Sequence, residues 1–228
     1  MSKNSAKEIH FKISEKAGTV SGLVLLPQGA KCLLVLAHGA GAGMGHKFMQ
    51  NTATKLAEKG IATLRYQFPY MEKGIKRPDS EAVLTASVRA AVSAAKKHAD
   101  GLPLFAGGKS MGGRMTSLAA AKEPLDYVRG LIYFGFPLHA AGKPSNDRAK
   151  HLADVKVPML FLQGTRDSLA DLAMLKPVVK GLGKRATLCL FDEADHSFHV
   201  PARTGRKDAE VRGEVLDALA KWAKRVAA

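Results

Sequence analysis

Short apolar runs alternate with longer amphipathic stretches along most of the chain. Continuous apolar runs predict strands buried on both faces, and apolar residues at helical spacing predict helices. The expected strands are residues 32–37, 61–65, 102–106, 130–134, 158–162 and 186–191. The expected helices are residues 48–59, 80–98, 114–121 and 208–227, the last with Val211, Val215, Leu219 and Trp222 facing the core. This alternation predicts an α/β fold, a mostly parallel, doubly wound sheet with helices on both faces.

The ends of this pattern and its longest loop complete the expected organisation. Residues 9–13 and 19–26 predict an edge hairpin around residues 17–18. We expect a single domain over residues 1–228, because a chain of this length can form one sizeable core. Residues 137–154 are long enough for a short lid segment, so the fold has at most a minimal lid. Ligands of such sheets bind beyond the carboxyl ends of the strands, where the informative residues are expected.

One strand-to-helix turn carries a candidate nucleophile. Gly108-x-Ser110-x-Gly112 matches the nucleophile elbow, a sharp turn that projects a serine hydroxyl above the sheet. Side chains at the two glycines would collide with the strand or the helix. The alternative is an ordinary connection in which Ser110 caps the helix. A phosphate-binding loop is excluded, because Pro103 stands where that loop needs its first glycine.

A glycine-rich loop, His38-Gly39-Ala40-Gly41-Ala42-Gly43-Met44-Gly45, follows the first buried strand. No frame in it matches the dinucleotide-binding fingerprint. Its backbone amides can instead stabilise a developing oxyanion, and we expect Ala40 and Met111 to form this oxyanion hole. The alternative is a flexible loop. We expect His38 to brace the loop rather than to transfer protons.

A serine nucleophile needs a base, and the base needs an acid that orients it. His196 follows the last expected strand and is the preferred base; the alternatives are His199 and a merely solvated loop histidine. Asp167 follows the strand before it and is the preferred acid, because Asp171 is expected in the next helix. The acids at 192, 193 and 195 lie too close to His196 along the chain. The order Ser, Asp, His is that of the α/β-hydrolases.

Five segments together resemble the small α/β-hydrolases related to dienelactone hydrolase: residues 38–43, 68–71, 107–114, 162–167 and 195–198. Within them the chain resembles the branch of the testis-expressed hydrolase-like proteins and the hydrolase-like domain of a chromatin-complex subunit. The resemblance spans roughly residues 20–225 and implies Ser110 as nucleophile, Asp167 as acid and His196 as base. Dienelactone hydrolase itself has a cysteine nucleophile, so its substrate does not carry over.

Two loops are expected to border the site, residues 66–79 and 136–154. Phe68, Tyr70 and Phe136 are the candidate substrate-pocket residues. Basic residues in the same loops would form a rim that favours anionic esters: Lys73, Lys76, Arg77, Lys143, Arg148 and Lys150. The alternative is that these charges simply solvate two exposed loops.

Composition narrows the classes of partner. The formal net charge is +15, but the basic residues are spread along the chain and aromatic residues make up only 6%. No specific nucleic-acid binding is therefore expected. No membrane association is expected either, because the chain shows neither a signal peptide nor a run that approaches the length of a membrane span. Cys32 and Cys189 are expected to be buried free thiols of a cytoplasmic protein.

The expected function is hydrolysis of a small-molecule carboxylic ester or thioester through an acyl-serine intermediate. This carboxylesterase- or thioesterase-like chemistry needs no metal and no organic cofactor. The alternative from another class is a catalytically silent binding or scaffold protein with the same fold. A serine, an aspartate and a histidine retained in register favour the enzyme.

Overall fold

An eight-stranded sheet forms the centre of the computed structural model, which describes residues 5–227. The strand order is β1-β2-β4-β3-β5-β6-β7-β8. Strand β2 pairs antiparallel with β1 and β4, and the other strand pairs are parallel. The bounds are β1 (Lys7–Ser14), β2 (Gly18–Leu25), β3 (Cys32–Ala37), β4 (Ile61–Tyr66), β5 (Leu104–Lys109), β6 (Val128–Phe134), β7 (Met159–Gly164) and β8 (Ala186–Phe191).

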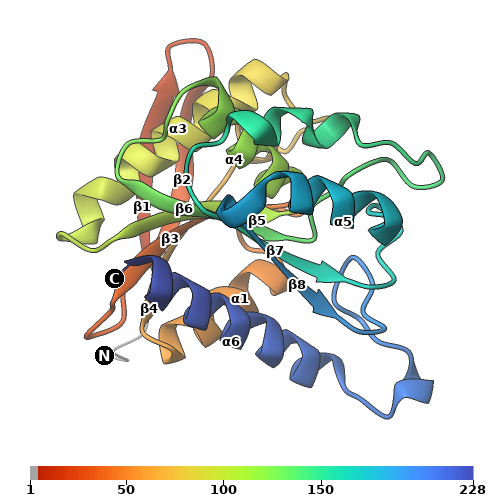
Figure 1. Ribbon diagram of the computed structural model, residues 1–228. Coiled ribbons are helices and arrows are strands. Elements are labelled where there is room, and N and C mark those ends of the chain that lie inside the picture. Colours follow the sequence, from red (N-terminus) through yellow and green to blue (C-terminus); the bar gives the residue numbers. More distant parts are fainter. Residues whose placement is uncertain (1–4, 228) are drawn as a thin grey trace.

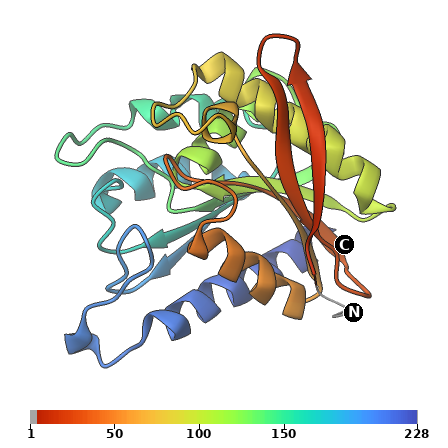
Figure 2. The same cartoon turned by 180° about the vertical axis from the view of Figure 1, so that it is seen from behind.

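Helices cover both faces of this sheet (Figures 1 and 2). On one face lie α1 (Lys47–Glu58) and α6 (Asp208–Ala227); on the other lie α3 (Glu81–Ala99), α4 (Met111–Lys122) and α5 (Leu172–Gly181). The shorter helices are α2 (Pro69–Glu72), η1 (Asp147–Asp154), η2 (Gly183–Arg185) and η3 (Ala202–Thr204). The predicted doubly wound α/β fold is confirmed.

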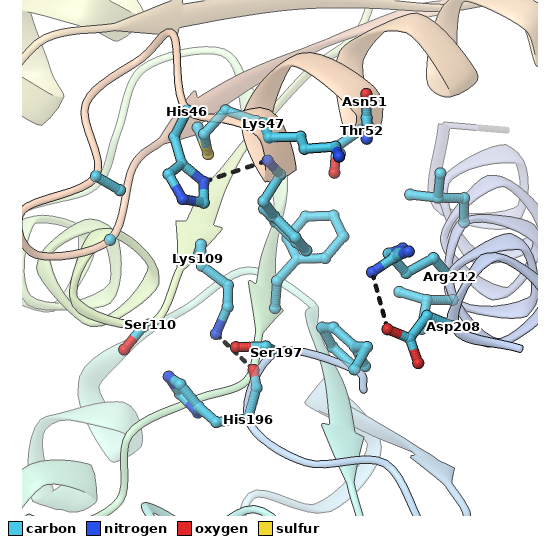
Figure 3. Close-up of a pocket in the computed structure, with 18 of the residues that line it drawn as sticks. His46, Lys47, Asn51, Thr52, Lys109, Ser110, His196, Ser197, Asp208 and Arg212 are labelled. Carbon is cyan, nitrogen blue, oxygen red and sulfur yellow. Dashed lines mark hydrogen bonds and ion pairs between the residues drawn. The ribbon is translucent and has the colours of Figure 1, made fainter. Parts of the chain in front are cut away.

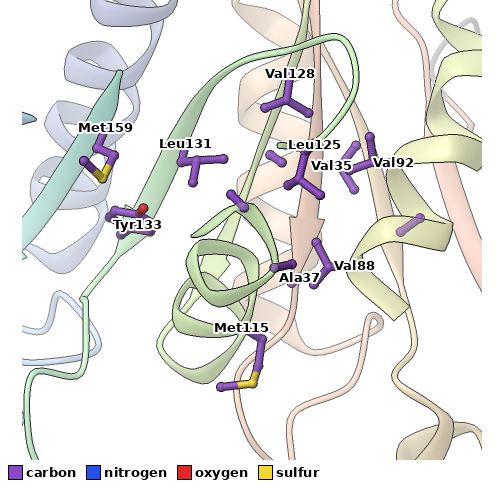
Figure 4. Packing of buried hydrophobic residues seen from close by; sticks show 14 of the residues in the cluster. Val35, Ala37, Val88, Val92, Met115, Leu125, Val128, Leu131, Tyr133 and Met159 are labelled. Carbon is purple, nitrogen blue, oxygen red and sulfur yellow. The ribbon is translucent and has the colours of Figure 1, made fainter. Parts of the chain in front are cut away.

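Each face of the sheet packs against its own buried apolar cluster, because successive residues of a strand point to opposite faces. On the face of α3 and α4, Val35 packs with Val88 and Met115 (Figure 4). On the face of α6, its neighbour Leu34 belongs to the cluster that contains Leu219. Strands buried on both sides therefore read as continuous apolar runs, which is what made them recognisable in the sequence.

The differences from the predicted elements lie mainly in the loops. The edge hairpin and the expected strands and helices are present, with ends shifted by up to three residues. The short helices α2, η1, η2 and η3 were not predicted, because helices of so few turns are too short to show a period, and α5 was expected only as the helix after Asp167, without bounds. Helix η1 packs against α4, and the lid role of residues 137–154 stays a prediction.

Two further observations concern the cysteines and the helices. Cys32 is buried and Cys189 half-buried, and both are free thiols. Burial raises the pKa of the Cys32 thiol to about 11, so it is an inert, protonated core residue. Within residues 5–227, no helix combines the length and the apolar character that a membrane crossing requires.

Leu219→Ala should destabilise the fold, because this fully buried α6 residue fills the cluster beneath the sheet. We expect the free energy of unfolding to fall by about 2–5 kcal/mol in urea titrations. Lys221→Ala, on the exposed side of the same helix, should change it by less than about 0.5 kcal/mol. Equal effects of the two substitutions would contradict the packing described for α6.

Candidate active site

Ser110 lies at the tip of the turn between β5 and α4. Its backbone has φ 51° and ψ −117°, a conformation that residues other than glycine rarely adopt. A Cβ at Gly108 would collide with the carbonyl of Ala37, and one at Gly112 would lie 2.5 Å from the carbonyl of His38. Among the described residues, the Ser110 hydroxyl makes no capping hydrogen bond to α4. The turn therefore matches the elbow and not the helix-capping alternative.

His196 and Asp167 form a close pair. Asp167 follows β7, His196 lies in the loop after β8, and the Nδ1 atom of His196 is 2.6 Å from Oδ2 of Asp167. The carboxylate side chain is fully buried, whereas the imidazole is 22% exposed. The Leu169 amide and the Gln163 side-chain amide also donate hydrogen bonds to this carboxylate. These donors and the histidine fix the orientation of the carboxylate.

The alternative acids and the alternative base have other partners. His199 is exposed and its Nδ1 atom lies 3.0 Å from Asp208. Asp171 caps α5 by accepting a hydrogen bond from the Ala173 amide, so it precedes the helix in which it was expected. Asp195 accepts the Ser197 and His199 amides within its own loop. Of the candidate acids, Asp167 is thus the one whose carboxylate contacts His196.

Side chains of β4 and of the residues after this strand hold the glycine-rich loop in place. His38 is buried, accepts a hydrogen bond from the Phe68 amide at Nε2 and donates from Nδ1 to the Gly39 carbonyl. Burial lowers the pKa of His38 to about 4, so it braces the loop as a neutral ring. The Tyr70 hydroxyl accepts the Gly41 amide at 3.0 Å. These contacts hold the loop in one conformation and argue against the alternative of a flexible loop.

The two candidate oxyanion donors belong to segments that lie next to Ser110. A Cβ at Gly39 would be 3.9 Å from Cβ of Ser110, so the segment that leads to Ala40 passes beside the serine. Met111 is the first residue of α4, where backbone amides have no partner within the helix.

A cavity of about 700 Å³ opens beside Ser110 and His196 (Figure 3). It extends between α1 and α6, and its apolar wall includes Phe48 and Met49 of α1, Val215 and Leu216 of α6, and Phe134 and Phe198. Such a mixture of an apolar wall and a few polar groups is typical of small-molecule sites.

The aromatic residues expected to line the pocket have other roles, which corrects that expectation. Phe68, Tyr70 and Phe136 are almost completely buried and belong to the core cluster on the face of α3 and α4. The first two support the glycine-rich loop, and the Phe136 amide donates to Gln163. Aromatic residues directly after strands can face the core or the site, and the sequence does not distinguish the two.

The basic residues of the cavity also lie outside the two loops that were expected to carry them. Lys47, Lys55, Lys109 and Arg212 line it, against one carboxylate, Asp208. Arg212 lies 3.7 Å from Asp208, which His199 also contacts. Lys47 and Lys55 are exposed and make no ion pair among the described residues. The expected basic rim is therefore corrected: the cations next to the cavity lie on α1, β5 and α6.

One supporting residue could have been found from the sequence. Gln163 is fully buried near the end of β7, where it donates to Asp167 and accepts the Phe136 amide at 2.9 Å. A polar residue that ends an otherwise apolar strand is a signal of such a buried hydrogen-bond network.

Solved structures with the same fold cover almost the whole chain. Dienelactone hydrolase from Anabaena variabilis has a TM-score of 0.74 at 22% identity, over 98% of this chain and 96% of that chain. A serine hydrolase without lid from Xanthomonas campestris has a TM-score of 0.72 at 22% identity, covering 96% and 95%. Est1E from Butyrivibrio proteoclasticus has a TM-score of 0.71 at 17% identity, covering 96% and 98%. At these identities the likeness shows the fold.

The likeness to dienelactone hydrolase expected from the motifs is thus confirmed for the fold, and the likeness to the testis-expressed and chromatin-subunit branch stays a prediction. No curated protein matches the sequence. Residues 30–224, most of the chain, match the family described as alpha/beta hydrolase domain. The elbow at Ser110 and the order of the sheet agree with this match, and the chain belongs to the alpha/beta hydrolase domain family.

Proposed function

We propose that this chain is a serine hydrolase that cleaves carboxylic esters or thioesters through an acyl-serine intermediate. The observation that carries the proposal is the His196–Asp167 pair, 2.6 Å apart, whose histidine lines the same cavity as Ser110. An oriented histidine next to a serine on an elbow is the arrangement that activates a hydroxyl for attack on a carbonyl.

In the first half of the reaction, His196 Nε2 takes the Ser110 proton while Oγ bonds to the carbonyl carbon. Asp167 holds Nδ1–H and stabilises the imidazolium that forms. The amides of Ala40 and Met111 bind the oxyanion, each contributing about 3–4 kcal/mol. When the tetrahedral intermediate collapses, the bond to the alcohol or thiol breaks and the leaving group takes the proton from His196.

In the second half, His196 takes a proton from water, and the hydroxide attacks the acyl carbon. Collapse of the second intermediate releases the acid and returns the proton to Ser110. The reaction balances with water as the co-reactant, and every proton moves through one histidine.

The cavity supports a substrate with an apolar acyl group and a negative charge. Phe48, Met49 and Leu216 offer an apolar wall, and Lys47 and Lys55 lie along the same cavity without a carboxylate partner among the described residues. An acyl chain that ends in a carboxylate would satisfy both. Cations near the site also attract an anion from solution, an effect that salt screens.

The cytoplasmic location and the single domain stay predictions. The free thiols of Cys32 and Cys189 support a reducing compartment.

Ser110→Ala should abolish labelling by a fluorophosphonate probe and lower the rate of ester hydrolysis by at least about 1,000-fold, because the nucleophile is lost. Ser197→Ala is the matched control, since Ser197 lines the same cavity. This control should keep its labelling. A folded wild-type protein that does not react with the probe would favour the binding or scaffold protein.

His196→Ala should lower kcat by at least about 1,000-fold, whereas His199→Ala should change it by less than about twofold. The two histidines share one loop, but His199 is exposed and pairs with Asp208. Rates measured with a p-nitrophenyl ester decide between them. A larger loss in the His199 variant would identify that residue as the base.

Charge preference can be tested with mono-p-nitrophenyl glutarate and p-nitrophenyl valerate, esters of equal carbon number. At low salt the wild type should have a higher kcat/KM for the glutarate, and Lys47→Gln/Lys55→Gln should lower that value about 3- to 10-fold. Lys176→Gln/Lys180→Gln, exposed on α5 across the sheet, should have no such effect. Equal values for both esters at all salt concentrations would refute the anionic preference.

A further inference from the structure

Lys109 precedes the serine in the elbow, and the proposed reaction does not use it. It ends β5, is partly buried, and its side chain lines the cavity next to Ser110 (Figure 3). Its Nζ atom donates a hydrogen bond of 2.7 Å to the backbone carbonyl of His196, 87 residues further along the chain. The residue next to the candidate nucleophile thus holds the main chain of the candidate base.

The loop that carries His196 contains strained backbone on both sides of the histidine. Glu193 has φ 57° and Phe198 has φ 60°, a left-handed conformation that costs energy for residues other than glycine. Such a conformation persists only where surrounding contacts hold it. Within the loop, the Asp195 amide donates to the His199 carbonyl at 2.9 Å, and the Arg166 amide holds the Ala194 carbonyl at 2.9 Å. At His196 itself, the side-chain amine of Lys109 holds the backbone carbonyl.

Gly135 provides the space in which the amine and the imidazole meet. Its φ is +66°, and an added Cβ would lie 3.1 Å from Nδ1 of His196 and 3.2 Å from Nζ of Lys109. The lysine stem is fixed on its other side, because a Cβ at Gly39 would lie 3.6 Å from Cγ of Lys109. The side chain therefore spans the gap between the glycine-rich loop and the loop of the base.

We propose that Lys109 is a positioning residue, which sets the place of the His196 ring relative to Ser110 by its hydrogen bond to the His196 carbonyl. This inference rests on the proposed function, since it assigns a task within that reaction. Lys109 forms no bond to substrate in this role. It connects the end of the nucleophile strand directly to the loop of the base, without an intermediate side chain.

The charges around the amine agree with this task. Burial lowers the pKa of Lys109 to about 8, and the nearby carboxylates of Asp167 and Asp195 act in the opposite direction by favouring its charged form. At neutral pH the amine is therefore mostly an ammonium, and a charged donor makes a stronger hydrogen bond to a carbonyl than a neutral one.

Loss of this bond should act on turnover rather than on substrate affinity. A misplacement of a reacting group by an ångström costs about 100-fold in rate. We expect Lys109→Ala to lower kcat and the maximal rate of fluorophosphonate labelling by about 10- to 100-fold, with KM changed by less than about threefold.

Chemical rescue separates positioning from a general effect on folding. Lys109→Ala lacks the atoms of one n-propylammonium ion, which should bind in the vacated space and restore labelling in a saturable manner. Lys109→Met fills that space without a donor, so it should be slow and not rescued. Tetramethylammonium, which has no N–H group, should rescue neither variant, and the wild type with each salt is the control for ionic strength.

Both variants labelled at the wild-type rate would overturn the proposal, and so would a slow Lys109→Ala protein that n-propylammonium does not accelerate. If Lys109→Ala does not fold, Lys109→Gln retains a neutral donor and must react faster than Lys109→Met; equal rates overturn the proposal. Failure of the proposed function looks different, because Ser110→Ala would then hydrolyse esters as fast as the wild type.

Discussion

The close contact between the β5–α4 turn and the end of β3 is the constraint on which the site depends. Ala37 pairs with Gly108 in the sheet, and the carbonyls of Ala37 and His38 lie against Gly112. No side chain fits between these backbones, and the serine between the glycines takes the φ of 51° that lifts it out of the strand. The same contact places the glycine-rich loop beside the serine. The Ser110 hydroxyl and the backbone amides of the glycine-rich loop are thereby positioned by the same close contact between backbones.

The other two residues of the site reach it through the regular geometry of the sheet. Strands β5, β7 and β8 run parallel in one sheet, so Ser110, Asp167 and His196 all leave it at the same edge. The distance between them is then decided by loops rather than by strands. Gln163 donates a hydrogen bond to the Asp167 carboxylate, and Lys109 donates another to the backbone carbonyl of His196. Buried polar groups thus supply the accuracy that strand spacing alone does not provide.

Much of this arrangement follows from local features of the sequence, and some of it does not. Strands buried on both faces are continuous apolar runs, and Asp167 and His196 follow such runs as Ser110 does, which is why their place at one end of the sheet could be predicted from the sequence. Their roles as acid, base and nucleophile stay a prediction. The walls of the cavity depend on how α1 and α6 pack relative to each other. Phe48 and Val215 belong to ordinary amphipathic helices, and only tertiary packing separates residues that face a cavity from those that face the core. Phe68 and Tyr70 are the opposite case: they were expected to line the pocket, and packing places them in the core.

The two faces of the sheet carry different tasks. The helix that starts at the elbow, α4, packs on the face of the larger cluster, whereas the cavity opens between the helices of the opposite face. Substitutions in α1 and α6 can therefore change the shape of the cavity without disturbing the packing that holds the elbow. In evolution or in directed libraries, the shape of the cavity can drift through α1 and α6 while the packing of the elbow on the other face is inherited intact.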